Sequence, residues 1–116
     1  MATRAVTVTD NNMRSATLTW SGLLNTDDGA PVELADYADR SIQVQGTPGA
    51  TPNLRIEGSN DGTNYVVLTD PQGTALNITT AGVIEQVEEI TRYLRPRVTG
   101  GDGTTNWTVT FFGRRI

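Results

Sequence analysis

Apolar and polar residues alternate with a period of two along most of the chain, which is typical of strands that bury one face. The clearest stretches cover residues 6–9, 16–20, 42–45, 54–57, 93–98 and 107–111. Every second side chain of such a strand points to a core, and the others point to water or to a partner. The expected core consists of the apolar positions Val8, Leu18, Trp20, Ile42, Val44, Ile56, Leu68, Val98, Val109 and Phe111.

Four further patterns refine this picture. The continuous apolar run 65–68 predicts a strand that is covered on both sides or carries a bulge. A short strand is expected at 76–78, and residues 83–90 are interpreted as a strand because the segment is short and rich in β-branched residues. Pro96 cannot donate to a ladder, so its strand is predicted to lie at an edge or at a bulge.

Turn-forming sequences rich in glycine, proline, asparagine and aspartate separate these segments. Short strands with frequent turns predict an all-β fold, a single β-sandwich or jelly-roll-like domain of about eight strands over residues 1–116. Residues 2–4 form a short N-terminal arm in this interpretation. Residues 21–40 form a long irregular connection, with a short strand around Val32 to Leu34.

The amino-acid composition excludes several classes of function. The chain has no cysteine and no histidine, which excludes disulfides, thiolate and imidazole catalysis and the usual zinc ligand sets. Its nine basic residues are all arginine, and thirteen acids give a net charge of −4, which disfavours nucleic acid and anionic membranes as partners. No apolar run approaches the ~20 residues that span a bilayer. We therefore expect a soluble protein that is not an enzyme and has no cofactor and no small-molecule substrate.

Clustered acids invite other interpretations. Asp27 and Asp28, near Asn25, could bind calcium, but an Asp-Asp-Gly turn explains them better, and the same holds for Asp102 in its glycine-rich turn. Adjacent glutamates among Glu85, Glu88 and Glu89 point to opposite faces of a strand, so a solvated face is favoured over the carboxylate pair of a glycosidase.

Aromatic residues could form a platform that stacks on sugars. Trp20 and Trp107 fall on the apolar phase of their strands, which predicts core packing. The pattern leaves Tyr65 and Tyr93 open between the core and such a platform.

The arginines near the C-terminus are the best candidates for a functional patch: Arg92, Arg95, Arg97, Arg114 and Arg115. Alternation places Arg95 and Arg97 on one face of a predicted edge strand, where their guanidiniums can pair with carboxylates of another protein. A solvated face that prevents edge-to-edge aggregation is an equally good interpretation.

Two stretches carry a resemblance to a known class of proteins. Residues 56–68 contain Gly-Ser-Asn-Asp-Gly-Thr-Asn-Tyr, and residues 92–103 begin Arg-Tyr-Leu-Arg-Pro-Arg-Val. Together with residues 20–23, 37–44 and 107–110 they resemble small structural proteins of tailed phages, of the head-decoration or capsid-cement kind. The resemblance implies a virion protein, made in the host cytoplasm, that binds the major capsid protein on the outside of the capsid and stabilises the shell.

The same two stretches also resemble discoidin-type jelly rolls, although the chain is shorter and lacks the cysteines of that family. A carbohydrate-binding jelly-roll module, or a tail or head-tail component, is therefore the alternative. Self-association as a dimer or trimer is left open. Loops and exposed charges are the natural contact elements, so the predicted partner-binding residues are Arg4, Asp27, Asp28, Tyr37, Arg95, Arg97, Arg114 and Arg115.

Overall fold

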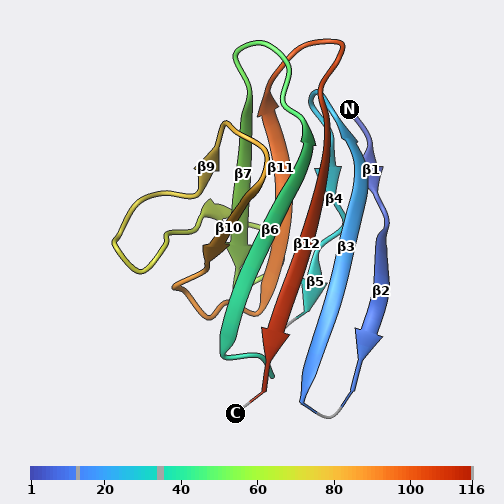
Figure 1. The fold of residues 1–116 in the computed structure, drawn as a ribbon. Coiled ribbons are helices and arrows are strands. Elements are labelled where there is room, and N and C mark those ends of the chain that lie inside the picture. The colour runs from blue at the N-terminus through green and yellow to red at the C-terminus, as the bar shows by residue number, and fades with distance from the viewer. Residues whose placement is uncertain (13, 34–35, 116) are drawn as a thin grey trace.

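The computed structural model describes residues 1–12, 14–33 and 36–115, and in this part the chain forms two packed β-sheets without a helix (Figure 1). The strands are β1 (Thr3–Arg4), β2 (Val6–Asn11), β3 (Ser15–Leu24), β4 (Asp28–Gly29), β5 (Val32–Glu33), β6 (Asp39–Thr47), β7 (Asn53–Ser59), β8 (Val66–Val67), β9 (Asn77–Ile78), β10 (Val83–Gln86), β11 (Tyr93–Gly100) and β12 (Asn106–Arg114). This confirms the predicted all-β sandwich.

The strand number differs from the expected eight for a simple reason. Seven strands have four or more residues, and six of them match the alternating stretches of the sequence. The seventh, β10, covers only residues 83–86 of the strand expected at 83–90. The other five are two-residue strands, β1, β4, β5, β8 and β9. A two-residue strand is too short to show a period. Three of these strands, β5, β8 and β9, begin within the short strands expected around Val32 and at 65–68 and 76–78, whereas β1 and β4 were not predicted as strands.

One sheet has five strands in the order β10-β6-β12-β3-β2, all antiparallel. The other has seven strands along the path β1-β4-β11-β7-β8, with β5 added to β11 and β9 added to β7. The segment expected to be irregular contains the end of β3, both short strands β4 and β5, and the start of β6. Val32 lies in β5 as predicted, whereas Leu34 lies outside the described residues.

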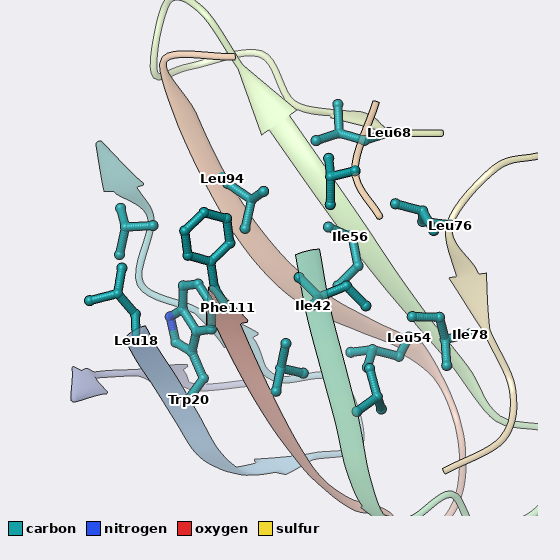
Figure 2. Packing of buried hydrophobic residues seen from close by; sticks show 14 of the residues in the cluster. Leu18, Trp20, Ile42, Leu54, Ile56, Leu68, Leu76, Ile78, Leu94 and Phe111 are labelled. Atoms are coloured by element: carbon teal, nitrogen blue, oxygen red, sulfur yellow. The ribbon is translucent and has the colours of Figure 1, made fainter. Parts of the chain in front are cut away.

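The core lies between the two sheets, as Figure 2 shows for 14 of its residues. Both tryptophans and Phe111 are fully buried, which confirms core packing for Trp20 and Trp107. All other expected core positions are buried except Val8, whose side chain is 55% exposed. Val8 pairs with Leu18 in the right phase, but it belongs to the outermost strand of its sheet, and an edge strand is only partly covered.

Two other expectations about strand environment are wrong. The run 65–68 is not covered on both sides, because Val66 is 63% exposed in β8. Pro96 is not at an edge, because β11 lies between β7 on one side and β4 and β5 on the other, and the register shift of β11 lies between Val98 and Gly100 rather than at the proline. β5 pairs with the first residues of β11 and β4 pairs with Arg97, so the proline faces the break between two short strands. An interrupted neighbour accommodates a residue without an N–H.

Gly29 has no side chain, which allows β4 to lie close to the core and to β11. A Cβ atom at this position would lie 2.6 Å from Cδ1 of Trp20 and 2.7 Å from Cδ of Pro96, both in buried rings. We expect Gly29→Ala to lower the free energy of unfolding by about 1–3 kcal/mol, because a packed site cannot yield to the extra methyl group.

Urea unfolding followed by circular dichroism measures this effect. Gly103→Ala is the matched control, since no atom lies within 4 Å of its added Cβ. Equal unfolding midpoints for the two variants would contradict the proposed close packing of β4.

None of the described residues belongs to a helix that is long and apolar enough to cross a membrane.

Candidate functional site

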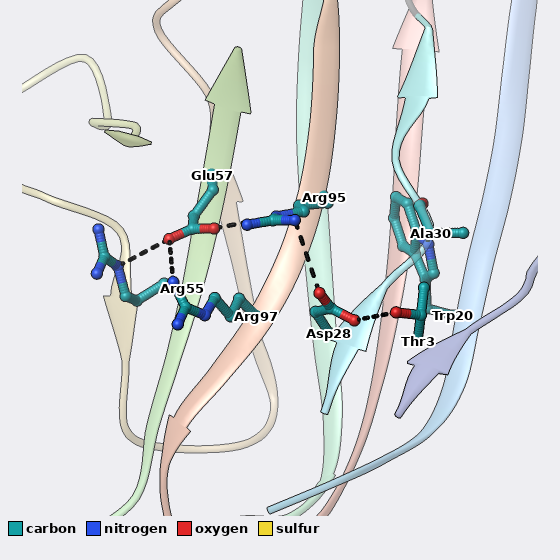
Figure 3. Close-up of polar contacts among 8 residues, drawn as sticks. All are labelled: Thr3, Trp20, Asp28, Ala30, Arg55, Glu57, Arg95 and Arg97. Carbon is teal, nitrogen blue, oxygen red and sulfur yellow. Dashed lines mark hydrogen bonds and ion pairs between the residues drawn. The ribbon is translucent and has the colours of Figure 1, made fainter. Parts of the chain in front are cut away.

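The outer side of the seven-stranded sheet carries a cluster of arginines and carboxylates that we call the arginine face: Asp28, Arg55, Glu57, Tyr65, Arg95 and Arg97. Figure 3 shows these residues except Tyr65. Alternation creates it, because Leu54 and Ile56 of β7 point to the core and their neighbours point outward. The register then brings the charges together. Glu57 lies opposite Arg95, and Arg97 lies between Arg55 and Asp28.

Glu57 is the centre of the arginine face. Its side chain is only 1% exposed, although it lies on the outer side of the sheet. Nε of Arg95 donates to Oε1 at 3.1 Å, and Nε of Arg55 and Nη1 of Arg97 lie 3.3 and 3.8 Å from Oε2. One buried carboxylate therefore holds Arg95 by a hydrogen bond and is the counter-ion of Arg55 and Arg97 on adjacent strands.

Asp28 and Tyr65 hold Arg95 from two further directions. Oδ2 of Asp28 lies 3.6 Å from Nη1 of Arg95, and the hydroxyl of Thr3 donates to Oδ1 of Asp28 at 2.7 Å. The guanidinium carbon of Arg95 stands 3.9 Å from the ring centroid of Tyr65, a cation–π contact. Burial raises the pKa of the Tyr65 phenol, and the charge of Arg95 opposes part of that shift.

Tyr93 has a similar neighbour on the same face. The guanidinium of Arg92 lies 5.2 Å from its ring centroid and is paired with Glu33 at 2.8 Å. The hydrogen bond from Arg92 lowers the pKa of Glu33. Tyr65 and Tyr93, which the sequence left open, are thus half-buried rings with an arginine stacked over each.

The arginine face carries three guanidiniums against two carboxylates, so positive charge is in excess on a protein whose net charge is −4. Arg97 is its most accessible arginine, with 44% of the side chain exposed against 19% for Arg95. Since β11 is an interior strand, the edge-strand interpretation of these two arginines is wrong. What remains is a surface with excess positive charge that can accept carboxylates from another protein.

Asp27 and Arg4 lie apart from the arginine face and attach the N-terminal arm. Asp27 is 3% exposed and accepts bonds from the N–H groups of Ala2 and Leu24, each at 2.9 Å, and from Nε of Arg4 at 2.7 Å. Burial alone would raise the pKa of Asp27, but the bonds from Leu24, Arg4 and Ala2 lower it on balance. The arm itself becomes β1, which pairs in parallel with β4.

Tyr37, Arg114 and Arg115 lie at the C-terminal end of β12, in the other sheet. Tyr37 is 7% exposed, beneath the guanidinium of Arg115 at 4.9 Å from the ring centroid. Arg114 donates from Nε and Nη2 to Oδ2 of Asp39 at 3.0 and 2.6 Å. Of the eight predicted contact residues, only Asp28, Arg95 and Arg97 belong to the arginine face, whereas Arg4 pairs with Asp27 and Tyr37 lies beneath Arg115. Arg55 and Glu57 were not among the predicted contact residues. They alternate with the apolar Leu54 and Ile56, and this alternation was the available signal that both side chains point outward.

The remaining acidic candidates are engaged in local structure. Asp102 accepts bonds from the hydroxyl and N–H of Thr104 and the N–H of Ala50, which lower its pKa. Glu89 accepts bonds from the N–H and hydroxyl of Thr69. Within residues 1–12, 14–33 and 36–115, no three acidic side chains are grouped in a way that could hold a metal ion.

The turn at Asn60-Asp61-Gly62 is built by its own side chains. Asp61 accepts bonds from the N–H groups of Thr63 and Asn64, the amide of Asn64 and the hydroxyl of Ser59. These bonds, led by those from Asn64, hold the pKa of Asp61 far below its usual range. The turn is architecture, as the sequence predicted.

Comparison with known proteins adds information on the fold. The structure is similar to that of the SPBc2 prophage-derived protein YomS, with a TM-score of 0.65 and 8% identity over 90% of this chain and 98% of that one. It is also similar to a cupin domain from Bordetella pertussis Tohama I, with a TM-score of 0.50 and 15% identity over 96% and 92% of the two chains. No protein-family model and no curated protein matches the sequence. At these identities the likeness shows the fold alone.

Proposed function

We propose that this protein is a structural component of a phage virion that binds the outside of the capsid and stabilises the shell. The observation that carries the proposal is the arginine face, a surface with excess positive charge on a small β-sandwich. The shared fold with a prophage-derived protein and the sequence resemblance to capsid-cement proteins support it.

The arginine face suits a protein partner that presents carboxylates, and the major capsid protein is the partner we propose. Charge-assisted bonds between guanidinium and carboxylate are among the stronger polar contacts. Glu57, Asp28 and Tyr65 already hold the guanidinium of Arg95 in place, so binding through this side chain costs little side-chain entropy. Repetition over a symmetric shell makes many weak contacts effective through avidity.

The test combines purified protein with particles that lack it, and measures co-sedimentation and the survival of the particles on heating. We expect wild-type protein to bind and to raise survival. The double variant Arg95→Ser with Arg97→Ser should bind more weakly and with less dependence on salt, because ions screen charge-assisted contacts.

Single variants distinguish the effect on binding of a charge in the arginine face from the effect of a charge elsewhere on the protein. Arg97→Ser removes the most accessible guanidinium and leaves the Arg95–Glu57 pair in place, and Arg14→Ser makes the same charge change at an exposed residue elsewhere. Weaker binding of Arg97→Ser alone is the expected result. Equal binding of the two would remove the arginine face from the interface, and no binding of wild-type protein would reject the capsid role. Binding to isolated tails instead would favour the alternative of a tail or head-tail component.

A further inference from the structure

The outer side of the five-stranded sheet differs in chemistry from the arginine face. Its strands β2, β3, β12, β6 and β10 lie side by side (Figure 1), and their outward side chains are uncharged over the middle of the sheet. Two cross-strand rows in this region are Thr7-Thr19-Thr110-Gln43-Ile84 and Thr17-Phe112-Ser41-Gln86. Hydroxyls and amides dominate, with two exposed apolar side chains, Ile84 and Phe112.

A hollow of about 400 Å³ lies at one end of this sheet face; we call it the Phe112 hollow. Its lining residues are Asp39, Arg40, Ser41, Gln86, Phe112 and Arg114. Phe112 is 44% exposed, whereas the preceding Phe111 is fully buried, so the strand period itself places an aromatic ring on the outside. The volume falls within the usual range of small-molecule sites.

The accessible charged groups around this ring form one ion pair, because Arg40, the third charged residue of the lining, is only 2% exposed and donates to the carbonyls of Tyr37 and Thr91. Arg114 donates twice to Oδ2 of Asp39, which cancels the two charges and leaves the second carboxylate oxygen able to accept a bond. The side chains of Ser41 and Gln86 supply donors and acceptors, and neither forms a hydrogen bond to any other residue that the structure describes. The hollow therefore combines an apolar ring with unused hydrogen-bonding groups of both kinds.

We propose that the Phe112 hollow binds a neutral saccharide unit. A pyranose ring has one face of C–H groups that packs on an aromatic ring, and it carries hydroxyls that donate and accept at its edge. A charged ligand would gain little from a neutralised ion pair, and a purely apolar ligand would leave the polar groups without partners. The adjacent rows of threonine and glutamine extend the same hydrogen-bonding surface for further sugar units.

The saccharide site is separate from the proposed capsid contact. The two outer faces of a β-sandwich point in opposite directions, so the Phe112 hollow lies on the far side of the molecule from the arginine face. A molecule bound to a particle through its arginines would present this hollow outward. The site does not require the capsid role, and each can be tested without the other.

The experiment titrates the ¹⁵N-labelled full chain with cellotetraose, maltotetraose and chitotetraose up to millimolar concentrations and follows amide shifts by NMR. We expect at least one of these probes to shift the amides of Ser41, Gln86 and Phe112. Phe112→Ala should weaken that binding about tenfold. Phe112→Tyr, which keeps the ring, and Ile84→Ala, which removes an exposed apolar side chain that does not line the hollow, should leave it within about twofold.

Three results would overturn the saccharide site: no amide shift with any probe, shifts at other residues only, or shifts that persist unchanged in Phe112→Ala. A dimer that sediments as such and dissociates in Phe112→Ala, without saccharide shifts, would assign this face to a second copy of the chain instead. Failure here is distinguishable from failure of the capsid proposal. Phe112→Ala should still bind particles, and Arg97→Ser should still bind the tetrasaccharide.

Discussion

Replacing Arg40 by methionine is expected to lower the free energy of unfolding by about 3–5 kcal/mol, one of the largest effects of a single substitution in this chain. Arg40 is 2% exposed and lies at the start of β6. Its Nε donates to the carbonyl of Tyr37 at 2.7 Å, and Nη2 donates to the carbonyl of Thr91 at 2.6 Å. Nη1 reaches the hydroxyl of Thr91 at 3.3 Å.

These bonds connect two segments that are far apart in the sequence, residues 37–40 and the segment around Thr91. Burial lowers the pKa of the Arg40 guanidinium, but the pKa of arginine is so high that the group stays charged at neutral pH. Methionine keeps most of the apolar volume and removes every side-chain donor, so the carbonyls of Tyr37 and Thr91 lose the bonds that Arg40 donates. The cost is that of unsatisfied polar groups rather than of a cavity.

Thermal unfolding followed by far-ultraviolet circular dichroism measures the effect, which should appear as a fall in Tm of roughly 10–20 °C. Arg14→Met is the matched control, because Arg14 is exposed and its substitution should change stability by less than about 0.5 kcal/mol. Arg40→Lys keeps the charge but lacks the planar guanidinium, so its Tm should lie between those of Arg40→Met and Arg14→Met. A Tm for Arg40→Met equal to that of Arg14→Met would show that the guanidinium bonds contribute nothing net.

Replacing Glu57 by glutamine is the second large effect that we expect, with a loss of about 3 kcal/mol. The substitution keeps the size of the side chain but removes the negative charge that Arg55, Arg95 and Arg97 share. The three guanidiniums then repel one another, and Arg95, the most buried of them, keeps only Asp28 at 3.6 Å as an anionic partner among the ion pairs of the described residues. Partial exposure of the arginines keeps the loss at the lower end of the range for a broken buried ion pair.

Salt should distinguish this cause from a simple packing defect. Ions screen repulsion between the guanidiniums, so the difference in Tm between Glu57→Gln and wild type should narrow as sodium chloride is raised. Glu88→Gln removes an exposed carboxylate and should cost little at any salt concentration. If the difference in Tm is independent of salt, or if the two variants are equally stable, Glu57 does not act as the shared counter-ion of the arginine face.

The alternation of apolar and polar residues was enough to predict the fold class and most of the core. Apolar side chains at every second position cover one face of each long strand, and that face must be buried wherever the sheets meet. Trp20, Trp107 and Phe111 were predictable in this way, and so was the outward direction of Arg95 and Arg97. The turn around Asp61 was predictable too, because its side chain bonds to its own neighbours.

Only the tertiary structure decided which outward residues meet. Period two assigns a side chain to a face but does not say which strands are neighbours, and neighbours come from pairing between distant segments. The pairing of β7 with β11 buries Glu57 under arginines, although the sequence places it on the solvent side. The same pairing makes β11 an interior strand, and the gap between β4 and β5 accommodates Pro96 there. The sequence by itself therefore determined which side chains point to the core and which point outward. The order of the strands in space decided which outward side chains meet, and so what each face can bind.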